Sequence, residues 1–249
     1  LKQGRKVIAV VANACSTATG SYDDLNKVAD FCEKYNLWMH VDGAHGASAL
    51  LSQKYRHLLK GIERADSVVW DAHKMMMIPT LITAVLFKNG KNSYKALSQE
   101  ASYLFEGDAE DEWYNYSHRT FECTKGMMGF KLYICLKTYG QKIFEEFIDY
   151  VYDLTAKFAQ MIEKADDFEL AVQPQSNIIC FRYTGIETDD ISSLQQKIRV
   201  KIFEREDFYI CQTALKDGFY LRCTIMNPYT TEKNLRELMD EIRDIAHNL

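Results

Sequence analysis

Three short strand-like runs lie within the first 71 residues and limit the folds open to this chain. They are Val7–Val11, Leu37–Val41 and Ser67–Trp70. A helical pattern from Asp23 to Tyr35 separates the first two runs, and we expect a second helix over 52–63 before the third. Strands separated by helical crossovers of this length pair in parallel. The sequence therefore predicts an α/β fold, in which Val7–Val11 is a strand buried on both faces.

The pattern changes after a further strand expected at Leu81–Phe87. Residues 98–117 are acidic and aromatic without a regular period, as in a functional or disordered loop. The remainder alternates between helical and strand-like segments, which are 125–139, 141–164, 168–172, 178–183, 190–205, 208–215, 218–226 and 231–247. This alternation predicts a small α+β domain with two hairpin-like strand pairs. We therefore divide the chain into residues 1–130, part of a larger domain, and residues 131–249, a small carboxyl-terminal domain.

Composition excludes several classes of function. The 249 residues are 47% hydrophobic and 26% charged, as in ordinary globular proteins. A net charge of −5 offers no basic patch for nucleic acid. The longest apolar run, Met75–Phe87, contains Pro79 and is too short to span a membrane. The seven scattered cysteines and six histidines form neither a disulfide framework nor a metal-binding motif, so we expect reduced thiols, a cytoplasmic location and no metal.

Polar residues follow two of the expected parallel strands at their carboxyl ends. Asp42 ends the second strand, and Asp71, His73 and Lys74 follow the third. Ligands of open α/β sheets bind beyond the carboxyl ends of the strands. Taken alone, a carboxylate and a lysine in such a place are as consistent with a simple ion pair as with a cofactor site.

Several longer motifs favour the cofactor site. The segments "HVDGAHGAS" (40–48) and "ADSVVWDAHK" (65–74) resemble those of the group II pyridoxal-phosphate-dependent amino-acid decarboxylases, which have the aspartate-aminotransferase fold. Four further segments fall in the family's order, namely "SYDDLNKVADFCEKYNLWMHVD", "RHLLKGIERADS", "ASYL" and "LRCTIMNPYTT". The resemblance extends over nearly the whole chain. It implies the carboxyl-terminal half of a longer polypeptide, because family members are about twice this length.

The resemblance implies a role for each residue at the strand ends. Lys74 would bind the aldehyde of pyridoxal 5'-phosphate, and Asp42 would face the nitrogen of its ring. Ala44, placed two residues further along an extended segment, would lie flat against that ring. Thr17 would contact the ring hydroxyl or the substrate carboxylate, and His73 would contact the cofactor phosphate or the substrate.

Two more distant residues complete the site that the resemblance implies. Arg222 would bind the substrate carboxylate, and Tyr103 would lie on a mobile loop and supply the proton that replaces CO₂. Asp71 departs from the asparagine of many relatives, and two roles are open for it: orienting His73 or taking a proton. His45 is a candidate wall of the pocket.

The function implied is that of a lyase of amino-acid metabolism: α-decarboxylation of an L-amino acid, with release of CO₂ and an amine. "MNPYTT" (226–231) favours a substrate like glutamate or diaminobutyrate. The expected assembly is a homodimer of the longer polypeptide, with no nucleic-acid or membrane partner. Two alternatives remain open: another pyridoxal-phosphate-dependent carbon–carbon lyase, or a catalytically incomplete fragment that serves as a structural or interaction module.

Overall fold

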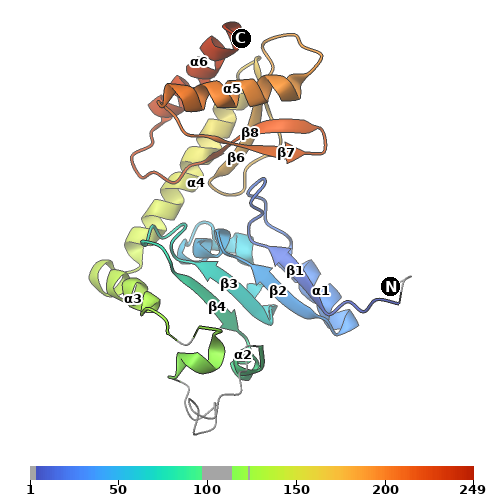
Figure 1. Ribbon diagram of the computed structural model, residues 1–249, viewed down its shortest axis with the longest axis vertical. Coiled ribbons are helices and arrows are strands. Elements are labelled where there is room, and N and C mark those ends of the chain that lie inside the picture. Colours follow the sequence, from blue (N-terminus) through green and yellow to red (C-terminus); the bar gives the residue numbers. More distant parts are fainter. Residues whose placement is uncertain (1–3, 97–113, 123) are drawn as a thin grey trace. The chain divides into compact units, whose positions relative to one another are not determined.

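The computed structural model describes residues 4–96, 114–122 and 124–249 (Figure 1). These residues form two compact units that interleave along the sequence. Unit 1 consists of Leu1–Asn13, Asp23–Ser48 and Leu59–Gln141, and unit 2 of Ala14–Tyr22, Ala49–Leu58 and Lys142–Leu249. The domain boundary between residues 130 and 131 stays a prediction. The loop after the first strand, Ala14–Tyr22, and part of the second crossover, Ala49–Leu58, belong to unit 2.

Unit 1 is built on a four-stranded sheet in the order β1-β2-β3-β4. The strands β1 (Ala9–Asn13), β2 (Trp38–Asp42) and β3 (Ser67–Asp71) are parallel, as predicted. The fourth strand, β4 (Thr83–Phe87), runs antiparallel to β3 at the edge of the sheet. The α/β class expected from the alternation of apolar runs is therefore confirmed.

The first crossover confirms the predicted helix and corrects the burial of the first strand. Helix α1 (Leu25–Tyr35) packs against β1 and β2 and buries Leu25, Ala29 and Cys32. The Asp24 side chain caps it by accepting a hydrogen bond from the Lys27 amide. The prediction that β1 is buried on both faces is wrong for this chain, because β1 is an edge strand and its Val11 is 57% exposed.

The second crossover is not the α-helix predicted over 52–63. It consists of three short 3₁₀ helices, η1 (Gly46–Leu51), η2 (Arg56–Leu59) and η3 (Ile62–Arg64). The Ser52 hydroxyl accepts hydrogen bonds from the Lys54 and Tyr55 amides, as at the start of a helix, but only the short 3₁₀ segment η2 follows. Gly61 then adopts a φ of +103°, which ends regular helix before η3. The left-handed conformation of Gly61 thus interrupts the segment that the apolar spacing predicts to be one helix.

The rest of unit 1 exposes much apolar surface. It comprises α2 (Lys91–Ala96), η4 (Tyr116–Arg119) and α3 (Met128–Tyr139), the last within the predicted segment 125–139. No residue of α3 is buried, and Phe130, Tyr133 and Ile134 are exposed. The loop predicted over 98–117 falls largely outside the described residues.

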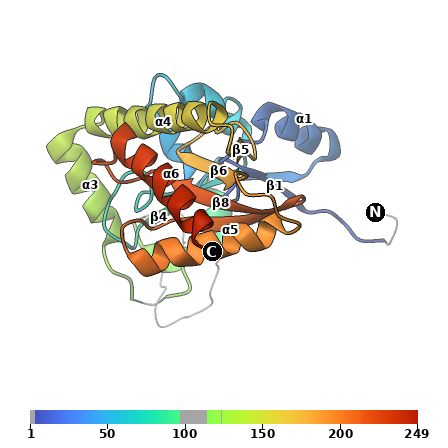
Figure 2. The ribbon, with the colours of Figure 1, turned by 90° about the horizontal axis from the view of Figure 1, so that it is seen from above.

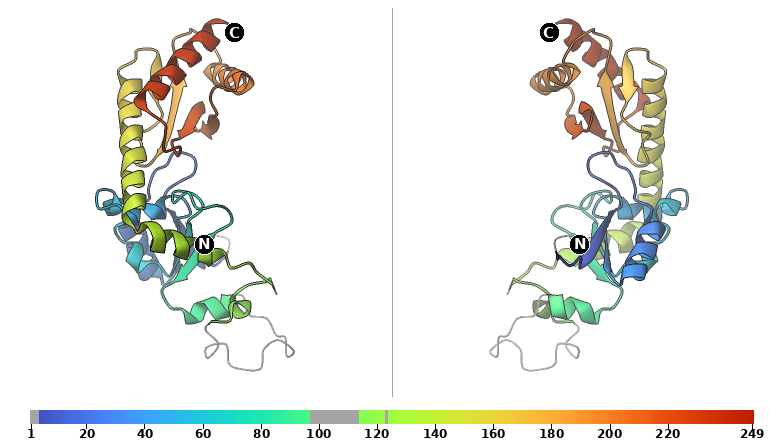
Figure 3. Two further views of the ribbon diagram at one scale, coloured as in Figure 1. Left: turned by 90° about the vertical axis from the view of Figure 1, so that its left-hand side faces the viewer. Right: turned by 90° about the vertical axis from the view of Figure 1, so that its right-hand side faces the viewer.

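Unit 2 is an α+β structure, as predicted. Its antiparallel sheet has the order β5-β6-β8-β7, formed by β5 (Phe168–Leu170), β6 (Ile178–Tyr183), β8 (Gly218–Thr224) and β7 (Cys211–Leu215). The long helix α4 (Lys142–Glu163) packs on β5 and β6, and α5 (Ile191–Arg205) packs on β8 (Figures 2 and 3). Helix α6 (Glu232–His247) contacts both helices.

The core of unit 2 lies between α4 and this sheet. The Phe158 ring of α4 and the Phe181 ring of β6 are 5.3 Å apart in an edge-to-face arrangement, and both side chains are fully buried. Helix α6 begins with a capping box between Thr231 and Asn234. Within the described ranges, no helix has the length and apolar character needed to cross a bilayer.

Candidate active site

The strands β2 and β3 are parallel neighbours, so their carboxyl ends lie side by side at one end of the unit 1 sheet. Asp42 is paired in register with Val69. The Gly43 amide donates a 3.1 Å hydrogen bond to the Val69 carbonyl, and the Asp71 amide donates one of 3.1 Å to the Ala44 carbonyl. The turn after β2 is therefore hydrogen-bonded to the end of β3. This pairing brings the segment that contains Asp42 and Ala44 to the edge where the Asp71–Lys74 segment begins (Figure 1).

The turn after β2 depends on the Asp42 side chain. Its Oδ1 atom accepts a 3.2 Å hydrogen bond from the Ala44 amide. Ala44 consequently lies in a turn, and the expectation that it continues an extended segment is wrong. Gly43 cannot carry a side chain here, because a Cβ atom would lie 2.7 Å from the Ala47 Cβ. The contact of Ala44 with a cofactor ring stays a prediction.

The turn after β3 anchors Lys74 between buried methionines and a buried acid. The Lys74 amide donates to the Asp71 carbonyl at 3.1 Å, and the next two residues of the turn, Met75 and Met76, are buried. The Lys74 side chain keeps 39% of its surface exposed, and its Nζ atom lies 3.0 Å from Asp71 Oδ2. The amine is thus both accessible and held by a fixed neighbour.

Asp71 is held in its charged form. Burial by itself raises the pKa of this carboxyl, but the neighbouring Thr83 and Lys74 side chains stabilise the anion more strongly, so that its pKa lies below the ordinary value. Its Oδ1 atom is buried and has no hydrogen-bond partner in the described structure. A carboxyl whose pKa is lowered is a poor proton acceptor near neutral pH, which argues against the second role left open for Asp71.

His73 is oriented by the backbone rather than by Asp71. Its Nδ1 atom lies 2.8 Å from the Ile82 carbonyl and 3.2 Å from the Ile82 amide. Its Nε2 atom is 3.8 Å from Asp71 Oδ2, which is beyond hydrogen-bond length. Because the backbone occupies Nδ1, Nε2 is the ring nitrogen placed toward the Asp71 carboxylate and suited to contact a ligand.

Thr17 and Arg222 come together within unit 2. The Arg222 Nε atom donates a 2.8 Å hydrogen bond to the Thr17 backbone carbonyl. Cys180, opposite Arg222 in the β6–β8 register, donates from its Sγ atom to the Ala18 carbonyl at 3.1 Å. These two bonds fasten the loop 14–22 to β8, which carries Arg222, and to β6, which carries Cys180. The contact uses the Thr17 backbone, so the predicted role of the Thr17 hydroxyl is not tested by it.

Two predicted residues have no placement that tests their role. Tyr103 lies outside the described residues. His45 is half-buried in the turn after β2, and its role as a pocket wall stays a prediction. Sequence reasoning missed Gly20 and Cys180, which support the loop that contains Thr17. The one available signal was for Gly20, which is a glycine in the small-polar stretch 13–21.

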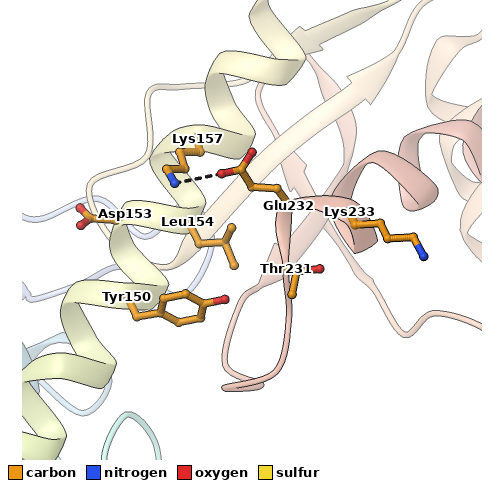
Figure 4. A pocket seen from close by; sticks show the side chains of 7 residues that line it. All are labelled: Tyr150, Asp153, Leu154, Lys157, Thr231, Glu232 and Lys233. Atoms are coloured by element: carbon orange, nitrogen blue, oxygen red, sulfur yellow. Dashed lines mark hydrogen bonds and ion pairs between the residues drawn. The ribbon is translucent and has the colours of Figure 1, made fainter.

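A cavity of about 490 Å³ lies elsewhere, within unit 2 (Figure 4). Tyr150, Lys157, Thr231 and Glu232 are among the residues that line it, and Lys157 Nζ is 2.9 Å from Glu232 Oε1. Of the predicted site residues that the structure describes, none lines this cavity. Across the described ranges, no cluster of three or more His, Cys, Asp or Glu side chains could hold a metal ion.

Comparison with known proteins identifies the family. Residues 1–184 match the pyridoxal-dependent decarboxylase conserved domain. The chain is 31% identical to the aromatic-L-amino-acid decarboxylase of Bacillus atrophaeus, over 99% of this chain and 52% of that protein. It is 37% identical to the acidic amino acid decarboxylase GADL1 of Homo sapiens, over 97% of this chain and 49% of that protein. The chain therefore spans about half the length of the curated relatives it matches.

A solved structure gives the same answer for the fold. The crystal structure of the glutamate decarboxylase domain of the diaminobutyrate-pyruvate transaminase and L-2,4-diaminobutyrate decarboxylase from Vibrio parahaemolyticus superposes with a TM-score of 0.81. The two proteins are 28% identical, and the match covers 97% of this chain and 47% of that chain. The predicted α/β fold of the pyridoxal-phosphate-dependent transferases is confirmed.

The residues of unit 1 fit a pyridoxal cofactor. An exposed amine at Lys74 can bond to an aldehyde, and the carboxylate of Asp42 at the same sheet edge suits a protonated ring nitrogen. The buried Asp71 Oδ1 atom without a partner is a further polar group of the kind found at ligand sites. With a match to the family's conserved domain over residues 1–184, these features show that the chain belongs to the pyridoxal-dependent decarboxylase family.

Proposed function

We propose that the polypeptide containing this chain is a pyridoxal-phosphate-dependent decarboxylase of an L-amino acid. The observation that carries the proposal is the placement of Lys74 at the carboxyl end of β3, on the sheet edge that also holds Asp42. A lysine in this position can hold the cofactor covalently yet exchangeably. The family match supports this choice over an ion pair of purely structural value.

Lys74 and Asp42 have complementary tasks toward the cofactor. When bound, pyridoxal phosphate supplies an aldehyde that bonds to amines and a ring that accepts the electron pair left by CO₂. Lys74 would hold the aldehyde carbon in place, and Asp42 would keep the ring nitrogen protonated through its negative charge. The turn that fixes Asp42 through the Ala44 amide also fixes the Ala44 methyl group. This methyl group would lie against the ring.

Arg222 is proposed to orient the substrate carboxylate. Loss of CO₂ requires the Cα–carboxylate bond to stand perpendicular to the cofactor ring, so orientation contributes more to the rate than affinity does. A guanidinium with one edge fastened to the Thr17 carbonyl is held in a defined direction. Its remaining N–H donors match a carboxylate in two-point geometry.

Two further residues are proposed to act on the substrate side. His73 presents Nε2 to the cofactor phosphate or to the substrate, because Nδ1 is occupied by the Ile82 backbone. Tyr103 donates a proton to Cα after CO₂ leaves. A Tyr103→Phe change should leave cofactor binding intact and divert part of the turnover to side products, which chromatography of the products would detect.

Glutamate or diaminobutyrate is the favoured kind of substrate. The segment 226–231 supports this choice, and GADL1 and the Vibrio protein carry acidic or diaminobutyrate substrates in their names. The relative from Bacillus atrophaeus is named for aromatic amino acids, so the family alone leaves the substrate open. A cytoplasmic homodimer is part of the same proposal.

The test is an assay of CO₂ and amine release by the full-length protein with pyridoxal phosphate. The panel is glutamate, aspartate, diaminobutyrate, cysteine sulfinate and aromatic amino acids, each with wild type and Lys74→Ala. The expected result is equimolar CO₂ and amine from an acidic or diaminobutyrate-like substrate, abolished in the variant. In a parallel incubation with sphingosine phosphate, release of an aldehyde and a phosphorylated amine would instead indicate a carbon–carbon lyase. Failure to bind the cofactor at all would leave a non-catalytic module.

A further inference from the structure

The Arg222 guanidinium is only as well oriented as the carbonyl that it bonds. Its Nε atom donates to the Thr17 carbonyl, which belongs to the loop 14–22 and not to a strand or helix. An arginine side chain has many rotamers, so its direction depends on the position of this loop. Whatever holds the loop near Thr17 therefore decides how well Arg222 can orient a substrate carboxylate.

The side chain of Cys180 holds the next carbonyl of the loop. Its Sγ atom donates to the Ala18 carbonyl at 3.1 Å, and the side chain is fully buried. Burial raises the pKa of the Cys180 thiol to about 11, so the thiol keeps its proton near neutral pH and can act as the donor. Two adjacent carbonyls of the loop are thus each bonded to one side chain. These side chains, Cys180 and Arg222, are paired in the β6–β8 register.

Two further cysteines show what distinguishes Cys180. Cys211 is paired with Arg222 in the β7–β8 register, so it lies on the same face of the sheet, on the other side of the arginine. Cys223 is buried like Cys180, but it follows Arg222 directly in β8, so its side chain points to the opposite face. Of these three thiols, only that of Cys180 is hydrogen-bonded to the loop 14–22 in the part of the chain that the structure describes.

We propose that Cys180 is a positioning residue: by holding the Ala18 carbonyl it fixes the neighbouring Thr17 carbonyl, and with it the direction in which Arg222 presents its remaining N–H donors to the substrate carboxylate. The consequence for the substrate rests on the proposed function, whereas the fastening of the loop is a property of the cofactor-free protein. The consequence concerns which bond at Cα breaks. A carboxylate held less firmly lets the Cα–H bond, instead of the Cα–carboxylate bond, stand perpendicular to the ring for part of the time.

The first measurement is amide hydrogen exchange of the cofactor-free, full-length protein, followed by mass spectrometry of peptides that cover residues 14–22. Amides within this loop are hydrogen-bonded to loop carbonyls, so their exchange reports the opening of the loop. Cys180→Ala removes the donor and should speed the exchange of these peptides about three- to tenfold. Cys180→Ser keeps a donor and should exchange within about twofold of wild type. The controls Cys211→Ala and Cys223→Ala should also change the exchange by less than about twofold.

The second measurement is the partition between loss of CO₂ and loss of the Cα proton, in the full-length protein with pyridoxal phosphate in D₂O. Glutamate and diaminobutyrate are the substrates. When the Cα–H bond breaks, its proton passes to solvent and a deuteron returns, so mass spectrometry of the recovered amino acid counts these events against the CO₂ released. Cys180→Ala should raise the ratio of deuterated amino acid to CO₂ about three- to tenfold, and Cys180→Ser should restore it. A loss of stability alone would lower the amount of active protein and leave the ratio unchanged.

Three results would overturn the inference. The first is unchanged exchange of the loop in Cys180→Ala, and the second is faster exchange with an unchanged ratio. The third is an equal effect of Cys223→Ala, because a lost buried thiol and not the contact with the loop would then be the cause. If Cys180→Ala does not fold, Cys180→Val, which fills the space without a donor, replaces it in both measurements. Release of neither CO₂ nor deuterated amino acid by wild type would contradict the proposed function alone, and the exchange rates would still decide whether Cys180 holds the loop.

Discussion

The Nε atom of Arg222 donates a 2.8 Å hydrogen bond to the backbone carbonyl of Thr17, a residue 205 positions earlier in the chain. This bond fastens the loop 14–22 to strand β8 within unit 2. An arginine carries five N–H donors, so the contact leaves the two Nη groups for a bound carboxylate. The geometry gives Arg222 a fixed direction, which is the property that an orienting residue needs.

Replacing Arg222 by lysine tests this orienting role. Lys retains the positive charge but loses the planar fork and the Nε contact with Thr17. We expect kcat/KM of the full-length enzyme to fall about 10- to 100-fold, as for loss of hydrogen bonds to a charged group. Arg182→Lys is the matched control, because Arg182 lies on β6 and pairs with Glu169. Steady-state kinetics with equal losses in both variants would refute the role.

Gly20 tests the support of the loop that contains Thr17. Its φ is +73°, and an added Cβ would lie 2.3 Å from Ser176 Oγ and 2.7 Å from Ile178 Cβ. Gly140 has nearly the same φ, +72°, with nothing within 4 Å. We expect Gly140→Ala to lower the free energy of unfolding by about 1 kcal/mol and Gly20→Ala by roughly 1–3 kcal/mol more. Urea unfolding would measure both, and equal losses would show that the loop is not packed as described.

Asp42→Asn separates the charge of Asp42 from its structural contact. Asparagine can still accept the hydrogen bond from the Ala44 amide through Oδ1, so the turn should persist. Loss of the charge should reduce kcat by about 10²- to 10³-fold, as for other preorganised electrostatic contacts. The variant should show an unchanged circular dichroism spectrum. Activity near the wild-type level would mean that Asp42 does not face the ring nitrogen.

The Asp167–Arg243 pair predicts a stability difference that depends on pH. Arg243 Nε and Nη2 bond the two carboxylate oxygens at 2.7 and 3.0 Å, and these hydrogen bonds lower the pKa of Asp167 below its ordinary 3.8. The stabilisation is fully present above pH 3.8 and is lost as the pH falls through the lower, folded-state pKa. Both side chains are partly exposed, so Asp167→Asn should cost about 1 kcal/mol at neutral pH.

Urea unfolding of wild type and Asp167→Asn between pH 7 and pH 3 would measure this difference. The gap between the two proteins should narrow only below about pH 4. The neighbouring, exposed Asp166 provides the control, since Asp166→Asn should change the free energy of unfolding by less than about 0.5 kcal/mol at any of these pH values. A gap that widened on acidification would contradict the assignment.

The sequence predicted those elements whose residues act locally. Strand β6 spans the predicted residues 178–183, because an apolar β-branched run bounded by turn residues has few other solutions. The predicted helix over 52–63 was wrong, because this segment forms short 3₁₀ helices and Gly61 adopts a left-handed conformation. Apolar spacing does not distinguish a 3₁₀ turn from an α-helical turn, and it does not encode a left-handed residue.

The candidate site was predictable in its residues but not in its contacts. The motif around Lys74 named the lysine, but only the turn after β3 shows that its amine meets Asp71. Similarly, Thr17 and Arg222 were chosen for their side chains, whereas the bond between them uses a backbone carbonyl. The pattern of side chains along a sequence does not show which atoms of two residues will bond. That pairing depends on the folded backbone.

The central claim is that Lys74 is the residue that bonds to pyridoxal phosphate. Incubation of the full-length protein with the cofactor, reduction with borohydride and peptide mass spectrometry would locate that bond directly. We predict a phosphopyridoxyl mass increment on the peptide containing Lys74, absent from the Lys74→Ala variant. An increment confined to another lysine, with Lys74 unmodified, would contradict the assignment.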